Sequence, residues 1–279
     1  MTTPDTANLA VFCDFENVAL GVRDARFAQF DISKVLERLL LKGSIVVKKA
    51  YCDWERYKEF KAAMHHASFE LIEIPHVRQS GKNSADIRMV VDALDLCYTK
   101  AHVDTFVVIS GDSDFSPLVS KLRENNKTVI GVGVKNSTSD LLIANCDEFI
   151  YYDDLVREQI GHEQKSRSGP RRKSTGRVSA TTGKTQGSER AAAPEDPAQE
   201  AIDLVRATYH ALVLERGAEE KIWGSMVKQA LKRRNPGFSE GYFGFSSFNK
   251  LLEEAQTRQQ LQLLRDEKSG GYIVRAAQD

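Results

Sequence analysis

Residues 106–115 read Phe-Val-Val-Ile-Ser-Gly-Asp-Ser-Asp-Phe, an apolar run that ends in a small, acidic turn. Large apolar residues without polar interruption, most of them β-branched, are typical of a buried strand in a parallel sheet. Gly111 permits a sharp turn after this strand, so Asp112 and Asp114 come directly after its carboxyl end. The stretch therefore predicts an α/β domain with carboxylates at one rim of its sheet.

The same pattern extends in both directions, from Leu9 to Tyr152. Short runs rich in β-branched and aromatic residues alternate with stretches of helical periodicity. This alternation predicts a parallel sheet of at least five strands, covered by helices on both faces. The expected strands span residues 9–13, 45–51, 69–74, 106–109, 129–134 and 149–151.

Capping signals and apolar stripes place the helices between these strands. Asp31 is the expected N-cap of one helix, and Ser116-Pro117 are expected at the N-cap and first position of another. A further helix opens near Ser84, and its expected sheet-facing stripe is Ile87, Val90, Val91 and Leu94.

Acidic residues adjoin the rim in two more places. Asp14 and Asn17 follow the first strand, and their side chains are expected to point inward. The sequence does not decide whether the Glu16 side chain points inward or outward. Asp86 lies in the first turn of its helix and extends the apolar stripe toward the sheet. Each cluster alone is often only a turn or a helix-dipole partner, but three on one rim predict a binding site.

The chemistry of this rim points to a metal. Clustered carboxylates repel and are tolerated mainly when a hard divalent cation neutralises them. All-oxygen ligands favour Mg²⁺ or Mn²⁺ over zinc, with Asn17 holding a phosphate oxygen or a water. Such a metal would activate water and stabilise charge on a phosphodiester. Lys82 and Asn83, in the loop before Asp86, are expected donors to a nucleic-acid backbone. The expected metal ligands are Asp14, Asp86, Asp112 and Asp114.

Charge and composition divide the chain. Lys plus Arg and Asp plus Glu both number 39, but residues 8–160 hold 23 acids and 19 bases, whereas residues 161–197 hold eight bases and four acids. Residues 158–197 are poor in large apolar groups and are expected to form a flexible basic linker between domains at 8–157 and 198–277. The cysteines have no paired spacing and sit in apolar runs, so we expect reduced core residues.

The C-terminal region regains regular periodicity. Helical stripes recur around Val205, Val227 and Leu251, and residues 261–264 and 272–274 flank Ser269-Gly270-Gly271 as an expected β-hairpin. Three helices and a hairpin predict a small winged-helix-like domain.

The motifs Asp14-Phe15-Glu16-Asn17, Gly81-Lys82-Asn83-Ser84-Ala85-Asp86 and Ser110-Gly111-Asp112-Ser113-Asp114-Phe115 resemble, in order, those of the NYN domain, a PIN-like ribonuclease family that includes LabA-like bacterial proteins. The resemblance covers about residues 8–157. It implies a PIN-like α/β fold and metal-dependent RNA cleavage, with the catalytic residues Asp14, Asn17, Asp86, Asp112 and Asp114.

The C-terminal region is similar to the LOTUS domain, also called OST-HTH, over roughly residues 198–277. The resemblance rests on residues 226–238, 245–248 and 251–252, and it implies RNA binding. Tyr242, Phe243 and Phe245 would be stacking groups, although a solvated basic face and an aromatic core are the alternative. The expected phosphate contacts are Lys228, Lys232, Arg233 and Arg234.

Three hypotheses follow. The first is a metal-dependent endoribonuclease with an RNA-binding tail, and the second is a non-catalytic RNA-binding adaptor. The third is a receiver-like phosphoacceptor, in which Asp53 would take phosphate and Lys135 would be its rim lysine. RNA is the expected partner and a homodimer stays open. The N-terminus lacks a signal sequence and no apolar run is long enough for a membrane span, so a cytoplasmic protein is expected.

Overall fold

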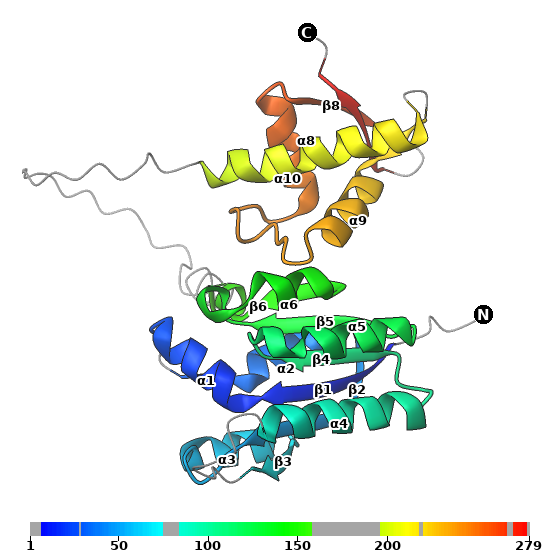
Figure 1. The fold of residues 1–279 in the computed structure, drawn as a ribbon. Coiled ribbons are helices and arrows are strands. Elements are labelled where there is room, and N and C mark those ends of the chain that lie inside the picture. Colours follow the sequence, from blue (N-terminus) through cyan, green and yellow to red (C-terminus); the bar gives the residue numbers. More distant parts are fainter. Residues whose placement is uncertain are drawn as a thin grey trace, which may run out of the picture.

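Two packed units follow one another along the chain (Figure 1). The computed structural model describes residues 7–27, 29–74, 84–157, 196–217, 220–266 and 270–277. The predicted linker at 158–197 therefore falls almost entirely outside the described residues. Within those ranges, no helix is both long and apolar enough to cross a membrane.

The N-terminal unit is built on a six-stranded parallel sheet of order β3-β2-β1-β4-β5-β6. The predicted α/β fold class is thereby confirmed. The strands are β1 (Ala7–Asp14), β2 (Gly43–Cys52), β3 (Glu70–Glu73), β4 (Thr105–Ile109), β5 (Thr128–Gly133) and β6 (Glu148–Tyr151).

Helices cover both faces of this sheet, which explains why its central strands are apolar on both sides. One face is packed by α1 (Phe15–Asp24), α2 (Ile32–Leu40) and α3 (Lys58–His66). The other is packed by α4 (Ser84–Thr99), α5 (Ser116–Glu124) and α6 (Asp140–Asn145). The 3-10 turns η1 (Ser113–Phe115) and η2 (Lys135–Ser137) follow β4 and β5, and residues 152–157 are helical after β6.

The strand order reverses between β1 and β4, and open α/β sheets place ligands at the carboxyl ends of strands beside such a reversal. Asp14 is the last residue of β1, and Ser110 comes directly after β4, the strand that pairs with β1 on this side. In a receiver fold, β1 instead lies between the second and third strands, so the strand order removes the support for the phosphoacceptor hypothesis.

The buried face of α4 differs from the predicted stripe. Met89, Ala93 and Cys97 are fully or almost fully buried, whereas Ile87 and Val91 are 63% and 56% exposed. Val90 and Leu94 pack against the core as predicted, but the helix carries apolar residues around much of its circumference, so periodicity alone did not show that Ile87 and Val91 are exposed.

The start of α5 also differs by one residue. Ser116 is its first residue rather than its N-cap, and the N-cap position is taken by Phe115 without a side-chain hydrogen bond. The capping group is one turn earlier, because an Asp112 carboxylate oxygen accepts from the Asp114 amide and begins η1, which runs directly into α5. The predicted N-cap at Asp31 is confirmed. All four cysteines are buried and free, as expected.

The C-terminal unit contains the expected helices and hairpin around its own core. Its elements are α8 (Pro197–Arg216), β7 (Ile222–Trp223), α9 (Gly224–Arg234), α10 (Phe248–Thr257), β8 (Leu261–Arg265) and β9 (Tyr272–Ala276). The short strand β7 was not expected, and it pairs with β9 to give an antiparallel sheet of order β7-β9-β8.

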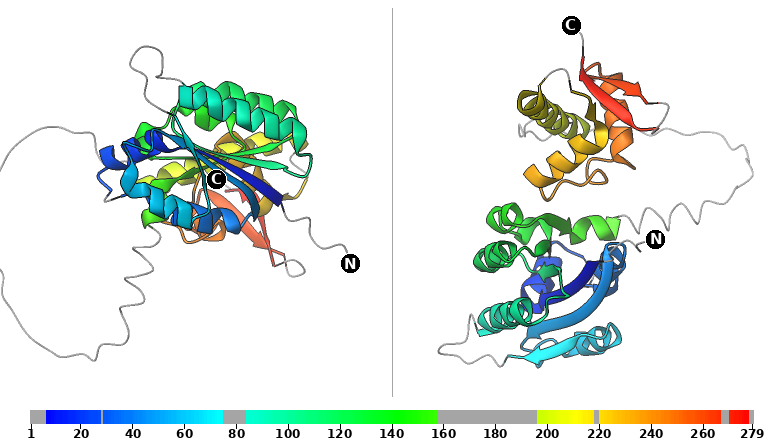
Figure 2. Two further views of the ribbon diagram at one scale, coloured as in Figure 1. Left: turned by 90° about the horizontal axis from the view of Figure 1, so that it is seen from below. Right: turned by 90° about the vertical axis from the view of Figure 1, so that its right-hand side faces the viewer.

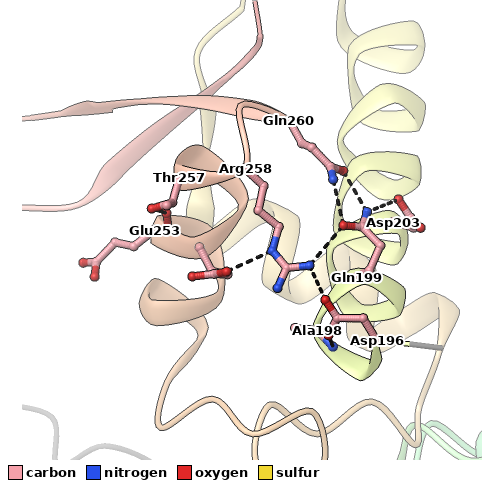
Figure 3. A network of polar contacts seen from close by, with 9 residues as sticks. Asp196, Ala198, Gln199, Asp203, Glu253, Thr257, Arg258 and Gln260 are labelled. Atoms are coloured by element: carbon pink, nitrogen blue, oxygen red, sulfur yellow. Dashed lines mark hydrogen bonds and ion pairs between the residues drawn. The ribbon is translucent and has the colours of Figure 1, made fainter. Parts of the chain in front are cut away.

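A polar network joins the start of α8 to the end of α10 (Figure 3). The Arg258 guanidinium donates to Asp196 at 2.5 Å, to Glu254 at 2.9 Å and to Gln199 at 3.2 Å. Gln199 and Gln260 also exchange amide hydrogen bonds at 2.9 and 3.1 Å. These contacts fix the first turn of α8, whose N-cap is Asp196, to the point where β8 begins.

The two units meet at the β6 edge of the large sheet (Figures 1 and 2). The Phe149 amide of β6 donates to the Pro236 carbonyl at 2.9 Å, so a segment of the C-terminal unit covers an otherwise unpaired strand edge. A Cβ at Gly237 would lie 2.7 Å from the Tyr151 hydroxyl. A side chain at this position would therefore displace the Tyr151 ring.

Candidate acidic site at the sheet switch point

Asp14 occupies the carboxyl end of the central strand β1 and serves as the N-cap of α1. One of its carboxylate oxygens accepts from the Ser110 hydroxyl at 2.9 Å, and the other accepts from the Asn17 amide at 3.4 Å. Only 7% of the residue is exposed. Asp14 is therefore held rigidly between the ends of β1 and β4.

Asn17 lies one turn into α1, on the same rim as Asp14. Its side-chain oxygen accepts from the Gly111 amide at 2.8 Å and so anchors the turn that carries the acidic pair. Gly111 itself is packed tightly, since a Cβ there would lie 2.4 Å from the Ser137 carbonyl oxygen. Close approach to η2, rather than the sharp turn expected from sequence, is what requires glycine here.

Asp86, Asp112 and Asp114 face the same region from α4 and η1, close enough for their charges to influence one another. Burial raises the pKa of Asp14 to about 7, and the nearby charges of Asp86 and then Asp112 add to the effect. Burial also raises the pKa of Asp86 to about 6, with further contributions from Asp112 and Asp114. The structure thus brings together the acids predicted from three separate segments.

Glu16 adds negative charge at the margin of this cluster. Its charge contributes to the raised pKa of Asp86. Its carboxylate is nevertheless paired with the Arg56 guanidinium at 3.1 Å, which directs the side chain toward the loop after β2. Glu16 therefore lies near the acidic residues but is engaged by a cation of its own.

The donor set fits a hard divalent cation, because the carboxylates supply only oxygen and oppose one another's ionisation. Among the residues that the structure describes, no three His, Cys, Asp or Glu side chains form a group already shaped to hold a metal ion. A donor set that suits a cation is compatible with the absence of a preformed metal group among the described residues, since like charges keep carboxylates apart until a cation offsets their repulsion.

Ser110 is the residue of this site that the sequence interpretation missed. Its hydroxyl donates to Asp14 and accepts from the Asp112 amide at 3.2 Å, so it couples the two acidic segments. The available signal was its position, one residue beyond the strand that pairs with the strand ending in Asp14. Lys82 and Asn83 lie outside the described residues.

The expected nucleic-acid contacts of the C-terminal unit are partly engaged within the chain. Lys228 pairs with Glu240 at 2.8 Å, and Lys232 lies 3.8 Å from Glu148 of β6. The Tyr242 ring receives the Lys135 ammonium 3.1 Å from its centroid. Arg233 and Arg234, at the end of α9, are exposed, and Arg234 donates to the Ala207 carbonyl at 3.4 Å.

A six-stranded parallel sheet with an acidic rim at its switch point is the architecture of a PIN-like α/β domain, the fold of the PIN-like nuclease superfamily. The sequence profile of the NYN domain matches residues 8–153, more than half of the chain. The chain belongs to the NYN domain family.

Two curated relatives each match about half of the chain. An uncharacterized protein of Methanocaldococcus jannaschii is 27% identical over 140 residues, covering 49% of this chain and 55% of its own. The meiosis regulator and mRNA stability factor 1 of Xenopus tropicalis is 25% identical over 150 residues, covering 54% of this chain and 9% of its own. The chain thus spans about half of the first relative and a small part of the second.

A solved structure also resembles the chain. The crystal structure of a protein of unknown function from Vibrio parahaemolyticus is 28% identical, with a TM-score of 0.49. The similarity covers 56% of this chain and 98% of that one.

Proposed function

We propose that this chain is a metal-dependent ribonuclease that hydrolyses phosphodiester bonds of RNA at the acidic rim. The observation that carries the proposal is the convergence of Asp14, Asp86 and Asp112 from three segments at the switch point of a NYN domain, where burial and neighbouring charges raise the pKa values of Asp14 and Asp86. Placing several carboxylates together lowers the stability of the fold, and such an arrangement is expected where the carboxylates bind a catalytic metal.

Mg²⁺ or Mn²⁺, held by Asp14, Asp86, Asp112 and Asp114, would supply an activated water and a counter-charge for the phosphate. Asp14 is positioned by Ser110 and the Asn17 amide, so its carboxylate has a fixed orientation. The Asn17 side chain fixes the turn bearing Asp112 through the Gly111 amide, and we assign it a positioning role. The sequence alone had led us to expect that Asn17 holds a phosphate oxygen or a water.

The C-terminal unit is proposed to be a LOTUS-like RNA-binding module that raises the local concentration of RNA near the acidic rim. The support is its three helices and hairpin, together with the basic end of α9. Arg233 and Arg234 are exposed and would supply phosphate contacts in the arrangement seen here. Lys228, Lys232 and Tyr242 would contribute after exchanging their present partners.

The test is cleavage of end-labelled single-stranded RNA by the full chain with Mn²⁺ or Mg²⁺. We expect Asp112→Asn to lower the rate by at least about 100-fold, since it removes a metal ligand while keeping an acceptor for the Asp114 amide. Lys61→Gln, which removes an ion pair with Glu55, a residue outside the acidic cluster, is the control.

Chelator should abolish cleavage by the wild-type chain. If the wild-type chain binds RNA tightly with or without chelator and cuts none of the RNAs tested, the alternative of a non-catalytic RNA-binding adaptor replaces the nuclease proposal.

A further inference from the structure

An open groove of about 700 Å³ begins at the acidic rim and runs between α4, the start of α5 and α6. Its volume is within the range of roughly 300–1,000 Å³ typical of small-molecule sites. Asp86 and Asp114 line one part of it, so the groove and the proposed catalytic site share two residues. An occupant of the groove would therefore lie directly beside the acidic cluster.

The groove gathers apolar side chains that the fold leaves in solvent. Ile87 and Val91 on α4 are 63% and 56% exposed, and Leu141 on α6 is 57% exposed. These helices pack side by side with α5 on one face of the sheet (Figure 1). Exposed apolar residues that line a common depression usually mark a binding surface, unlike apolar residues scattered singly.

Beyond the two carboxylates at the rim, the polar groups of the groove suit an uncharged ring rather than a phosphate. Among the residues described, its lining contains two carboxylates and no lysine or arginine. Hydroxyl groups come from Ser113, Ser116 and Ser120. The Ser116 hydroxyl is buried without a hydrogen-bond partner in the described structure, so a polar edge reaching this wall would satisfy it.

We propose that this groove binds a nucleobase of single-stranded RNA, the one adjacent to the phosphate held at the acidic rim. The inference rests on the proposed function for the identity of the ligand. The backbone phosphate stays at the metal-binding carboxylates, and the neighbouring base packs its faces against Ile87, Val91 and Leu141. The serine hydroxyls meet the base edges, which gives the site a means of preferring one base over another.

The first experiment locates the base. Full-length Asp112→Asn chain, which retains the groove, is mixed with single-stranded RNA carrying 4-thiouridine at successive positions, irradiated and analysed by mass spectrometry. We expect crosslinks in the α4 and α6 peptides that contain Val91 and Leu141. Crosslinks confined to the C-terminal unit, with cleavage by the wild-type chain intact, would overturn the groove assignment and leave the nuclease proposal standing.

The second experiment measures the energetic contribution of the groove. Ile87→Ser and Val91→Ser should each weaken RNA binding several-fold to about tenfold and shift the preferred cleavage positions, with the thermal midpoint unchanged. Leu41→Ser is the matched control, because Leu41 is a 79% exposed apolar residue distant from the groove in sequence and absent from its lining.

The outcomes separate the two proposals. Groove crosslinks with no cleavage of any RNA by the wild-type chain would support the base site and overturn the hydrolytic function. Groove variants that bind and cut RNA normally but change the sedimentation of the chain would assign the surface to protein association and overturn the base site.

Discussion

At the scale of single residues, the acidic rim places function and stability in opposition. Asp14 is held by two hydrogen bonds, yet burial and neighbouring charges raise the pKa of its carboxyl from 3.8 to about 7. The folded chain therefore binds a proton here more tightly than the unfolded chain. Stability falls as the pH rises through this interval, and the penalty is complete above pH 7.

Asp14→Asn should consequently stabilise the metal-free chain at alkaline pH. The neutral amide still offers an oxygen to Ser110, and it removes an ionisation penalty of up to about 4 kcal/mol at 1.36 kcal/mol per pKa unit. The difference in free energy of unfolding from wild type should be larger at pH 8 than at pH 5 in urea titrations with chelator. An equal difference at both pH values would indicate a packing effect and contradict the electrostatic explanation.

The hydrogen bonds of the site show what the sequence could not provide. Runs of residue types predicted that Asp14, Asp86 and Asp112 share a rim, because parallel strands end on the same side of a sheet. The contact between Asn17 and Gly111 depends on two segments 94 positions apart in the chain and on a backbone approach of η2. No local pattern encodes that distance, so the positioning role of Asn17 emerges only from the structure.

At the scale of secondary-structure elements, strands were easier to predict than helix faces. Continuous apolar runs such as β4 have few alternatives, and both flanking layers bury them. In α4, by contrast, the choice between adjacent apolar rows depends on the neighbouring α5 and the sheet. Ile87 and Val91, which were predicted to face the sheet but are exposed, line the proposed base groove. The difference between the predicted and observed faces of α4 therefore identifies exposed apolar residues whose presence the packing of the core does not explain.

The orientation of α4 can be measured directly. Met89→Ala should lower the free energy of unfolding by roughly 2–5 kcal/mol, because Met89 is fully buried between the helix and the sheet. Ile87→Ala should change it by no more than about 0.5 kcal/mol, since its side chain is largely exposed. Urea unfolding of both variants in parallel is the test. A larger cost at Ile87 than at Met89 would mean that α4 is rotated relative to the arrangement described.

At the scale of the whole molecule, the β6 edge joins the two units. The backbone contact from Phe149 to Pro236 pairs that edge, while Lys232 and Tyr242 contact Glu148 and Lys135 of the N-terminal unit. Groups expected to bind RNA thus hold the units together. The proposed RNA binding by the C-terminal unit would compete with this contact, because the same side chains cannot satisfy both partners at once.

Gly237→Leu should shift that equilibrium toward separated units. A side chain at this position meets the Tyr151 ring, with a Cβ already 2.7 Å from the hydroxyl oxygen, whereas each unit keeps its own core. We expect a larger radius of gyration by small-angle X-ray scattering and tighter RNA binding in an Asp112→Asn background, because Lys232 and Tyr242 lose their present partners. Ser246→Leu introduces the same side chain at an exposed position and should change neither quantity. Unchanged scattering for Gly237→Leu would show that the contact between the two units accommodates the side chain. Separated units with unchanged RNA affinity would show that Lys232 and Tyr242 are not part of the RNA-binding surface.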